Sequence, residues 1–362
     1  MKIQAQSGTL ASALALVTAV SAKSKIGIVH VTADDVVTLT GTNQNITIAA
    51  KAVAVVSEAG SIALDGDRLA ALVAGFGKAV ALDISTDGNR VLIADAGRGY
   101  RLPTVPAAEL PTALALDGEI GRLKIAGADL LRLMEPLEAT DRDTARYYLR
   151  GVLWHTVENT LVATGTDGKC LIRCKILAGA FSSGRDLVLP AAAVVVLNKL
   201  VRAAKPLTVT LRRSRTLLSV ECPDFKFVTR LIDVVYPAYE TVIPPSSANA
   251  FVCNRVELID ALIRLTAVST STAPLVALSW SNGRSVDLIL ARQPDAGADA
   301  ICGIASGSAR FAAPIEQVAA MLGELRDKNI RLEHTEGRPL VMQGETTEQK
   351  IALVMLAAWN FN

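Results

Sequence analysis

The chain has 362 residues, a near-neutral net charge of +2 and 51% hydrophobic residues, of which few are aromatic. This length allows two or three domains with their own cores, and no apolar run reaches the roughly 18 residues that span a membrane. The five cysteines are an odd number whose spacing fits no zinc site. We therefore expect reduced thiols in a cytoplasmic protein without a membrane segment.

A helix-like apolar pattern near the N-terminus returns twice, at intervals of 120 and 128 residues. In each copy the apolar residues stand at i, i+4 and i+7, the spacing of a buried helix face. The copies are Leu10, Leu14 and Val17, then Leu130, Met134 and Leu137, then Leu258, Leu262 and Leu265. The first copy resembles a secretory signal peptide, but the recurrence of its pattern inside the chain favours an amphipathic helix.

A second helix-like stretch follows each copy, and a run of alternating strand pattern follows that stretch. The helical stretches are 67–76, 190–204 and 314–326, and the strand runs are 80–111, 207–244 and 330–357. Turn signals such as Thr86-Asp87-Gly88-Asn89 separate the strands, as hairpins require. We therefore predict an α+β fold of three tandem repeats, each with two helices and antiparallel sheets, at 1–120, 121–245 and 246–362.

Charge is unevenly divided among the three predicted repeats. The first and the third each carry a net charge of −2, whereas the second carries +6. A basic face on the middle repeat would suit a polyanion, although a chance distribution of solvated side chains is the plainer alternative.

The usual signatures of catalysis are missing. No Walker-type phosphate loop occurs, and the three histidines lack metal-ligand spacing. Asp141, Asp143 and Asp167 are a possible carboxylate set, but helix-end and turn positions explain them better. We expect no cofactor, no metal and no catalytic residue. The enzyme alternative, a hydrolase using Asp167 or Cys170, lacks a base–nucleophile pair.

Three strings of the middle repeat carry a family resemblance. Residues 146–153 read RYYLRGVL, 163–171 read ATGTDGKCL, and 227–239 read FVTRLIDVVYPAY. In order and spacing they resemble the bacterial DNA polymerase III β subunit, the β sliding clamp, and the resemblance extends over the whole chain. It implies a head-to-tail homodimeric ring of six repeats around double-stranded DNA, with helices lining the hole and no catalysis.

The resemblance also implies an apolar pocket between the second and third repeats. Family members bind peptides there from the DNA polymerase III α subunit, the clamp loader and other proteins with a clamp-binding motif. The matching residues are Leu149, Thr166, Gly168, Lys169, Cys170, Leu171, Pro237, Thr241, Val242, Leu353 and Met355, with Val341 a weaker candidate. Lys169-Cys170 stands where the family has His-Arg, and Thr241 replaces an arginine, so the partners can differ.

Two further sets of residues follow from the resemblance. For DNA they are Lys23, Lys25, Arg142, Arg146, Lys199, Arg202 and Lys205, the last three spaced along one predicted helix. For ring closure they are Tyr100 and Leu102 of one chain against Ala267 and Val268 of the other. The main expectation is a DNA polymerase processivity factor. The alternative is a divergent accessory clamp-like binding protein that does not act as the main replicative clamp.

Overall fold

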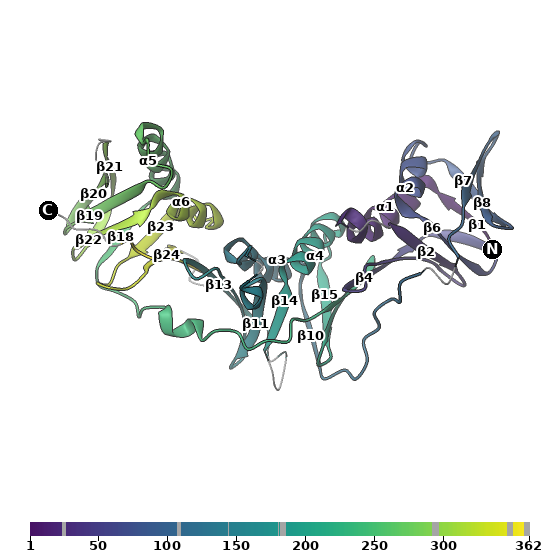
Figure 1. The fold of residues 1–362 in the computed structure, drawn as a ribbon, viewed down its shortest axis with the longest axis horizontal. Coiled ribbons are helices and arrows are strands. Elements are labelled where there is room, and N and C mark those ends of the chain that lie inside the picture. The colour runs from purple at the N-terminus through teal and green to yellow at the C-terminus, as the bar shows by residue number, and fades with distance from the viewer. Residues whose placement is uncertain are drawn as a thin grey trace. The chain divides into compact units, whose positions relative to one another are not determined.

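The computed structural model (Figure 1) describes residues 1–23, 27–106, 110–143, 145–179, 181, 186–291, 297–345 and 350–357. The strands of this part of the chain form three sheets, and their pairings are antiparallel throughout. The predicted α+β class is therefore confirmed. The chain divides into two compact units, unit 1 (1–131, 178–185 and 192–233) and unit 2 (132–177, 186–191 and 234–362).

Unit 1 contains two sheets. The smaller has the order β5 (Ala54–Glu58), β1 (Lys2–Gln6), β7 (Ala81–Asp87), β8 (Arg90–Asp95) and β9 (Arg98–Pro103). The larger has the order β10 (Gly121–Ala126), β15 (Thr208–Arg213), β16 (Leu217–Glu221), β17 (Phe225–Arg230), β4 (Ile46–Ala52), β3 (Val37–Thr42), β2 (Ile28–Ala33) and β6 (Gly60–Asp65).

Unit 2 contains one long sheet. Its first part has the order β14 (Leu187–Pro190), β11 (Gly151–Val157), β12 (Thr160–Thr166), β13 (Cys170–Leu177), β25 (Lys350–Val354) and β24 (Leu340–Gly344). It continues with β23 (Asn329–Glu333), β18 (Ala250–Asn254), β21 (Ala298–Ser306), β20 (Gly283–Leu290), β19 (Leu275–Trp280) and β22 (Ala309–Pro314). Within the described ranges, no helix of either unit is both long and apolar enough to span a membrane.

Each α-helix begins directly after a strand, once early and once late in each predicted repeat. The helices are α1 (Ser7–Val17), α2 (Gly66–Ala74), α3 (Gly127–Met134), α4 (Ala191–Ala204), α5 (Arg255–Val268) and α6 (Ile315–Glu324). Short 3-10 turns are η1 (Thr18–Lys23), η3 (Glu135–Ala139), η4 (Tyr147–Leu149) and η5 (Tyr239–Val242). In Figure 1, α1 and α2 lie side by side, as do α5 and α6.

The apolar spacing predicted the buried helix faces well, with one correction. Leu10, Leu14 and Val17 are buried in α1, and the matching leucines of α5 are buried too. Leu137, however, lies beyond the end of α3, in η3. The reason is Pro136, which has no N–H to continue an α-helical ladder, so the chain tightens into a 3-10 turn.

Sheet pairing joins segments that the sequence assigns to different repeats. In unit 1, Ile48 of β4 pairs with Phe227 of β17. In unit 2, Ile172 of β13 pairs with Ala352 of β25. These continuous ladders tie one part of the middle repeat to the first repeat and the other part to the third. Residues of the middle repeat therefore belong to both compact units. The repeat boundaries at 120 and 245 stay predictions.

Candidate functional site

An apolar pocket of about 230 Å³ lies in unit 2, beside the pairing of β13 with β25. Its lining residues are Leu149, Thr166, Gly168, Lys169, Cys170, Leu171, Pro237, Ala238, Tyr239, Val242, Pro339, Leu353 and Met355. Ten of the eleven residues predicted from the sequence are therefore brought together. The exception is Thr241, whose hydroxyl donates to the Ala238 carbonyl at 2.8 Å.

The turn between β12 and β13 forms one wall of the pocket. The Asp167 carboxylate accepts from the amides of Lys169 (2.8 Å) and Cys170 (2.7 Å), and the Thr166 hydroxyl donates to the Cys170 carbonyl at 2.6 Å. Gly168 has φ +83°, a left-handed conformation that side chains disfavour. Asp167 thus holds a turn, as the sequence indicated.

Arg146 supports this turn from behind. Its guanidinium donates to the Asp167 carbonyl at 2.9 Å and lies 2.7 Å from the Asp141 carboxylate. The side chain that the sequence assigned to DNA therefore makes two contacts within unit 2 while staying 42% exposed. Its planar fork can bridge two acceptors at once, which suits it to fix the turn.

The segment 237–242 forms the opposite wall. The Tyr239 hydroxyl lies 2.7 Å from Nε2 of His155, and burial raises the pKa of Tyr239 to about 12. Sequence analysis missed Ala238, Tyr239 and Pro339 as lining residues. Tyr239 stands in the same YPAY string as Pro237, which was a usable signal, whereas Pro339 belongs to no motif.

Two residues of the C-terminal strand region complete the apolar lining. Leu353 is 2% exposed and pairs with Leu171, whereas Met355 is 47% exposed and stands just after β25. Val341 pairs with Leu353 from the other side but does not line the pocket. A flexible methionine at the mouth adapts to side chains of different shape.

Cys170 is a buried residue of the pocket lining. Burial raises the pKa of its thiol to about 12, so the nucleophilic thiolate is scarce at neutral pH. Cys170 and Cys174 lie on one face of β13, as the sequence predicted, and all five cysteines are unpaired.

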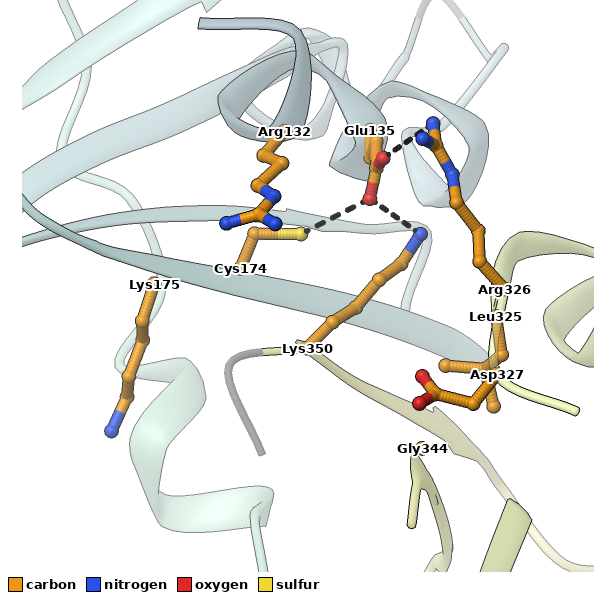
Figure 2. Close-up of a pocket in the computed structure, with 9 residues that line it drawn as sticks. All are labelled: Arg132, Glu135, Cys174, Lys175, Leu325, Arg326, Asp327, Gly344 and Lys350. Atoms are coloured by element: carbon orange, nitrogen blue, oxygen red, sulfur yellow. Dashed lines mark hydrogen bonds and ion pairs between the residues drawn. The ribbon is translucent and has the colours of Figure 1, made fainter. Parts of the chain in front are cut away.

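The other end of the same strand pairing carries a charged cavity (Figure 2). One Glu135 oxygen accepts from Nζ of Lys350 at 2.8 Å, and the other lies 2.8 Å from the Arg326 guanidinium. The Cys174 thiol points at the same carboxylate, with sulfur 3.8 Å from oxygen. Glu135 and Lys350 side chains are each only 12% exposed, so this cluster is largely internal.

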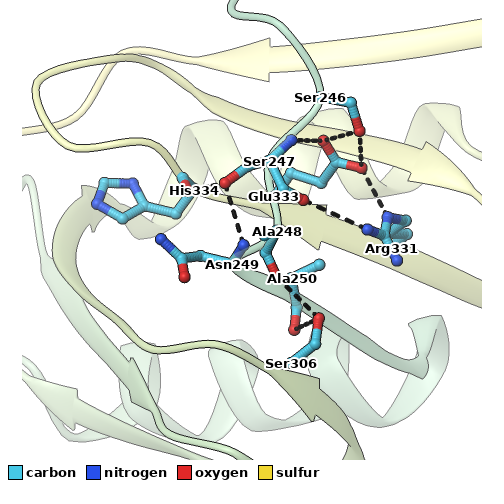
Figure 3. A network of polar contacts seen from close by, with 9 residues as sticks. All are labelled: Ser246, Ser247, Ala248, Asn249, Ala250, Ser306, Arg331, Glu333 and His334. Carbon is cyan, nitrogen blue, oxygen red and sulfur yellow. Dashed lines mark hydrogen bonds and ion pairs between the residues drawn. The ribbon is translucent and has the colours of Figure 1, made fainter.

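A polar network fixes the chain that leads from the pocket wall to β18 (Figure 3). The Glu333 carboxylate accepts from the Ser247 amide (2.9 Å), from the Ser246 hydroxyl and from Arg331 (2.6 Å). Burial alone raises the pKa of Glu333, but these donors outweigh it and hold the pKa below its usual range. The linker is thus tied to the sheet shortly after Val242.

Comparison with known proteins assigns the family. A profile of the DNA polymerase III beta subunit N-terminal domain matches residues 1–115, and one of its central domain matches 127–238. Together they cover well over half of the chain. The chain belongs to the DNA polymerase III beta subunit family. The fold class and the resemblance given by the sequence are thereby confirmed.

Individual relatives of this family agree. The beta sliding clamp of Proteus mirabilis is 24% identical over 69% of this chain and 69% of the relative. That of Vibrio cholerae is 25% identical over 59% of this chain and 58% of the relative. A crystal structure of the Pseudomonas aeruginosa DnaN sliding clamp bound to griselimycin has a TM-score of 0.91 at 21% identity, covering 99% of each chain.

The lysines and arginines predicted to contact DNA lie in different local surroundings. Lys199 and Arg202 are exposed on α4, and Arg142 is exposed. Lys205 is a correction, since it lies beyond α4 with φ +47°, where Pro206 prevents the helix from continuing. Lys25 lies outside the described residues, and Lys23 ends η1, without its side chain being described.

The residues predicted for ring closure stand at two exposed places. Tyr100 and Leu102 belong to β9, the edge strand of the smaller sheet of unit 1. Tyr100 is 39% exposed and meets Phe76 edge-on. In unit 2, Ala267 and Val268 end α5, and Val268 is 53% exposed.

Proposed function

We propose that the protein is a ring-shaped sliding clamp, a processivity factor that encircles duplex DNA as a homodimer. It tethers a DNA polymerase and other replication proteins through short peptides bound in the apolar pocket. Because a closed ring leaves its DNA only at an end or an opening, tethering follows from topology and raises the local concentration of the partner. Beside family membership, one repeated strand pairing supports this proposal.

The pairing joins equivalent strands of successive repeats. β4 of the first repeat pairs with β17, the last strand of the second, and β13 of the second pairs with β25, the last strand of the third. The next pairing in the series would join the first half of β21, residues 298–302, to β9 of another copy. Among the described residues, 298–302 pair only with β20, and β9 pairs along its length only with β8. Two chains joined twice in this way close a ring of six repeats.

Sedimentation at micromolar and nanomolar concentration tests the ring. We expect a species of about twice the 38.1 kDa chain mass. Substituting Tyr100→Asp and Val268→Asp together should give monomers, because a carboxylate would be buried without a partner. The matched control is Val55→Asp on the opposite edge strand β5, which should stay dimeric. A wild-type monomer at both concentrations would contradict the ring.

We propose the apolar pocket as the peptide site, and griselimycin is a suitable probe because a relative is crystallised with it. Val242 is 43% exposed and lines the pocket, so Val242→Asp should weaken griselimycin binding by tenfold or more. Val235, in the same segment, is 87% exposed and lies outside the lining, so Val235→Asp should bind normally. Equal griselimycin affinities of the two variants would contradict the pocket as the peptide site.

We further propose that DNA meets the basic middle repeat, with Lys199 and Arg202 of α4 attracting phosphates without reading bases. The double variant Lys199→Glu with Arg202→Glu should stay on circular DNA for a shorter time than the wild type. Linear DNA should release the wild type and the variant rapidly. Equal retention on circular and linear DNA would contradict encirclement.

We propose that the protein is non-catalytic and acts in the cytoplasm. The accessory clamp-like alternative is not favoured, because the relatives are named as beta sliding clamps. The altered residues Lys169, Cys170 and Thr241 bear on which partners bind. A hydrolase assay with a Cys170→Ala control addresses the enzyme alternative directly.

A further inference from the structure

The outward face of β13 changes from apolar to positively charged as the strand runs away from the pocket. Alternate residues of a strand share a face, so Leu171, Arg173 and Lys175 stand in one row, on the side opposite the buried Cys174. Leu171 lines the apolar pocket. At about 3.3 Å per residue, Arg173 and Lys175 follow roughly 7 and 13 Å farther along the strand. These two residues, the cationic strip, therefore begin where the pocket ends.

The Arg173 guanidinium is half-buried without a full set of acceptors. Its Nε atom is buried and has no hydrogen-bond partner in the structure. Burial is the largest cause acting on this group, and it lowers the pKa of Arg173. The guanidinium has thus given up water without a matching gain in charge-assisted hydrogen bonds. An anion that reached its N–H groups would restore that interaction.

Lys175 adds a second positive charge. The neighbouring Arg173 cation is the main cause that lowers the pKa of Lys175, so the two side chains repel each other. Lys175 borders the charged cavity of Figure 2, but its side chain points away from the Glu135 carboxylate there. A single anion between Arg173 and Lys175 would relieve this repulsion and be attracted by both.

The groups around the strip offset its charge only in part. The Glu240 carboxylate acts on Arg173, but it is 56% exposed and lies 3.9 Å from Nε2 of His155. Tyr239 separates the strip from the pocket, whose lining it joins. Burial raises the pKa of Tyr239 to about 12, so its hydroxyl is uncharged at neutral pH and provides no counter-ion for Arg173.

We propose that the cationic strip is an anion subsite beside the peptide pocket, which receives a carboxylate side chain of the bound peptide. An extended peptide advances about 3.3 to 3.6 Å per residue, so an acidic residue about two to four positions beyond the apolar part reaches Arg173 and Lys175. Arg173 can bind a carboxylate through two N–H groups, and Lys175 contributes a point charge. This inference rests on the proposed function, since it assigns an acidic residue to the same peptides.

Two matched versions of one labelled peptide test the subsite. Both carry a clamp-binding motif, and one is extended by three aspartates where the other has three asparagines, at either end in turn. At the end that faces the strip, the aspartate version should bind about fivefold more tightly. The gain should shrink toward zero at about 0.5 M salt, because partly exposed charges are screened. Equal affinities of the two versions at both ends would overturn the proposal.

Charge variants locate the gain in the strip. Arg173→Gln with Lys175→Gln should abolish the preference for aspartate and leave binding of the asparagine peptide unchanged. Lys175→Gln alone should remove part of the preference, and it serves where replacing the half-buried Arg173 disturbs the fold. Lys328→Gln, at an exposed lysine of the same unit, is the control and should keep the preference. A preference that survives in the double variant would overturn the proposal.

Two further variants separate the subsite from the pocket. Glu240→Gln should enlarge the preference for aspartate, because it removes a carboxylate that competes for Arg173. Val242→Asp should weaken binding of the asparagine peptide, which depends on the pocket alone. If Val242→Asp leaves that binding unchanged, the proposed peptide site itself fails. If Val242→Asp weakens it and aspartates still bring no gain in the wild type, the subsite alone fails.

Discussion

The two ends of the β13–β25 pairing share one backbone ladder and have opposite chemistry. At one end Cys170 pairs with Val354, and at the other Cys174 pairs with Lys350. The first end is lined by the β12–β13 turn and by apolar side chains from the segment 237–242 and from β13 itself. The second receives charged side chains from η3 and from the chain after α6. What flanks a ladder, rather than the ladder itself, determines what each end can do.

The contrast separates the proposed peptide site from an internal support. The charged end satisfies its groups within the protein, since Glu135 has both Lys350 and Arg326 as partners. The apolar end leaves Val242 and Met355 more than 40% exposed, and their surface gains by meeting a ligand. With the proposed peptide site at the apolar end, one ladder would serve both to hold the sheet and to receive a partner.

The largest effect that we expect is at the apolar end, with Leu353→Asp. Leu353 is 2% exposed, so its replacement by a carboxylate should lower the free energy of unfolding by roughly 4 kcal/mol. The new aspartate can reduce this loss only by staying protonated to a higher pH than usual. Met355→Asp, at a site 47% exposed, should cost less than about 1 kcal/mol while still impairing griselimycin binding. Urea unfolding measures both. Similar losses of stability for the two variants would contradict the difference in burial between Leu353 and Met355.

At the charged end we expect an intermediate effect from Lys350→Met. Removing one partner of a mostly buried ion pair should cost about 2 kcal/mol, and a double-mutant cycle with Glu135→Gln should show coupling. Arg326→Ala is the control, because its side chain is 73% exposed and should cost less than about 1 kcal/mol. Additive effects of the Lys350 and Glu135 changes would argue that the pair contributes nothing of its own.

The smallest effect concerns pH at the charged end. Burial raises the pKa of Glu324, and the nearby Glu138 and Glu135 carboxylates add to this. Because the folded-state pKa lies above the usual value of 4.5, stability from the protonated form is lost as the pH rises through the folded pKa. Glu324→Gln, which cannot ionise, should therefore gain stability relative to the wild type as the pH rises above 4.5. Denaturation at several pH values measures the difference, and a gain that grows toward acid pH would contradict the sign.

Sequence patterns predicted those features that depend on local periodicity. The buried stripes of α1 and α5 follow from apolar spacing alone. The pocket set was implied by the family resemblance that the motif strings carry. Lys205 was placed wrongly because a helix end is determined by a neighbour, here Pro206. Tyr239 and Pro339 reach the pocket only through tertiary packing, and the Glu135–Lys350 pair joins positions too distant in the chain for any spacing rule.

The β13–β25 pairing also has a consequence for the order of assembly. β13 is synthesised long before β25, yet β25 is its neighbour in the finished sheet. Until that strand leaves the ribosome, the outward amides and carbonyls of β13 remain available to any extended chain. Long-range closure of this kind slows folding and lengthens the interval in which a nascent chain can aggregate. Pairing with β25 therefore completes the floor of the proposed peptide site and ends this vulnerable interval in a single event.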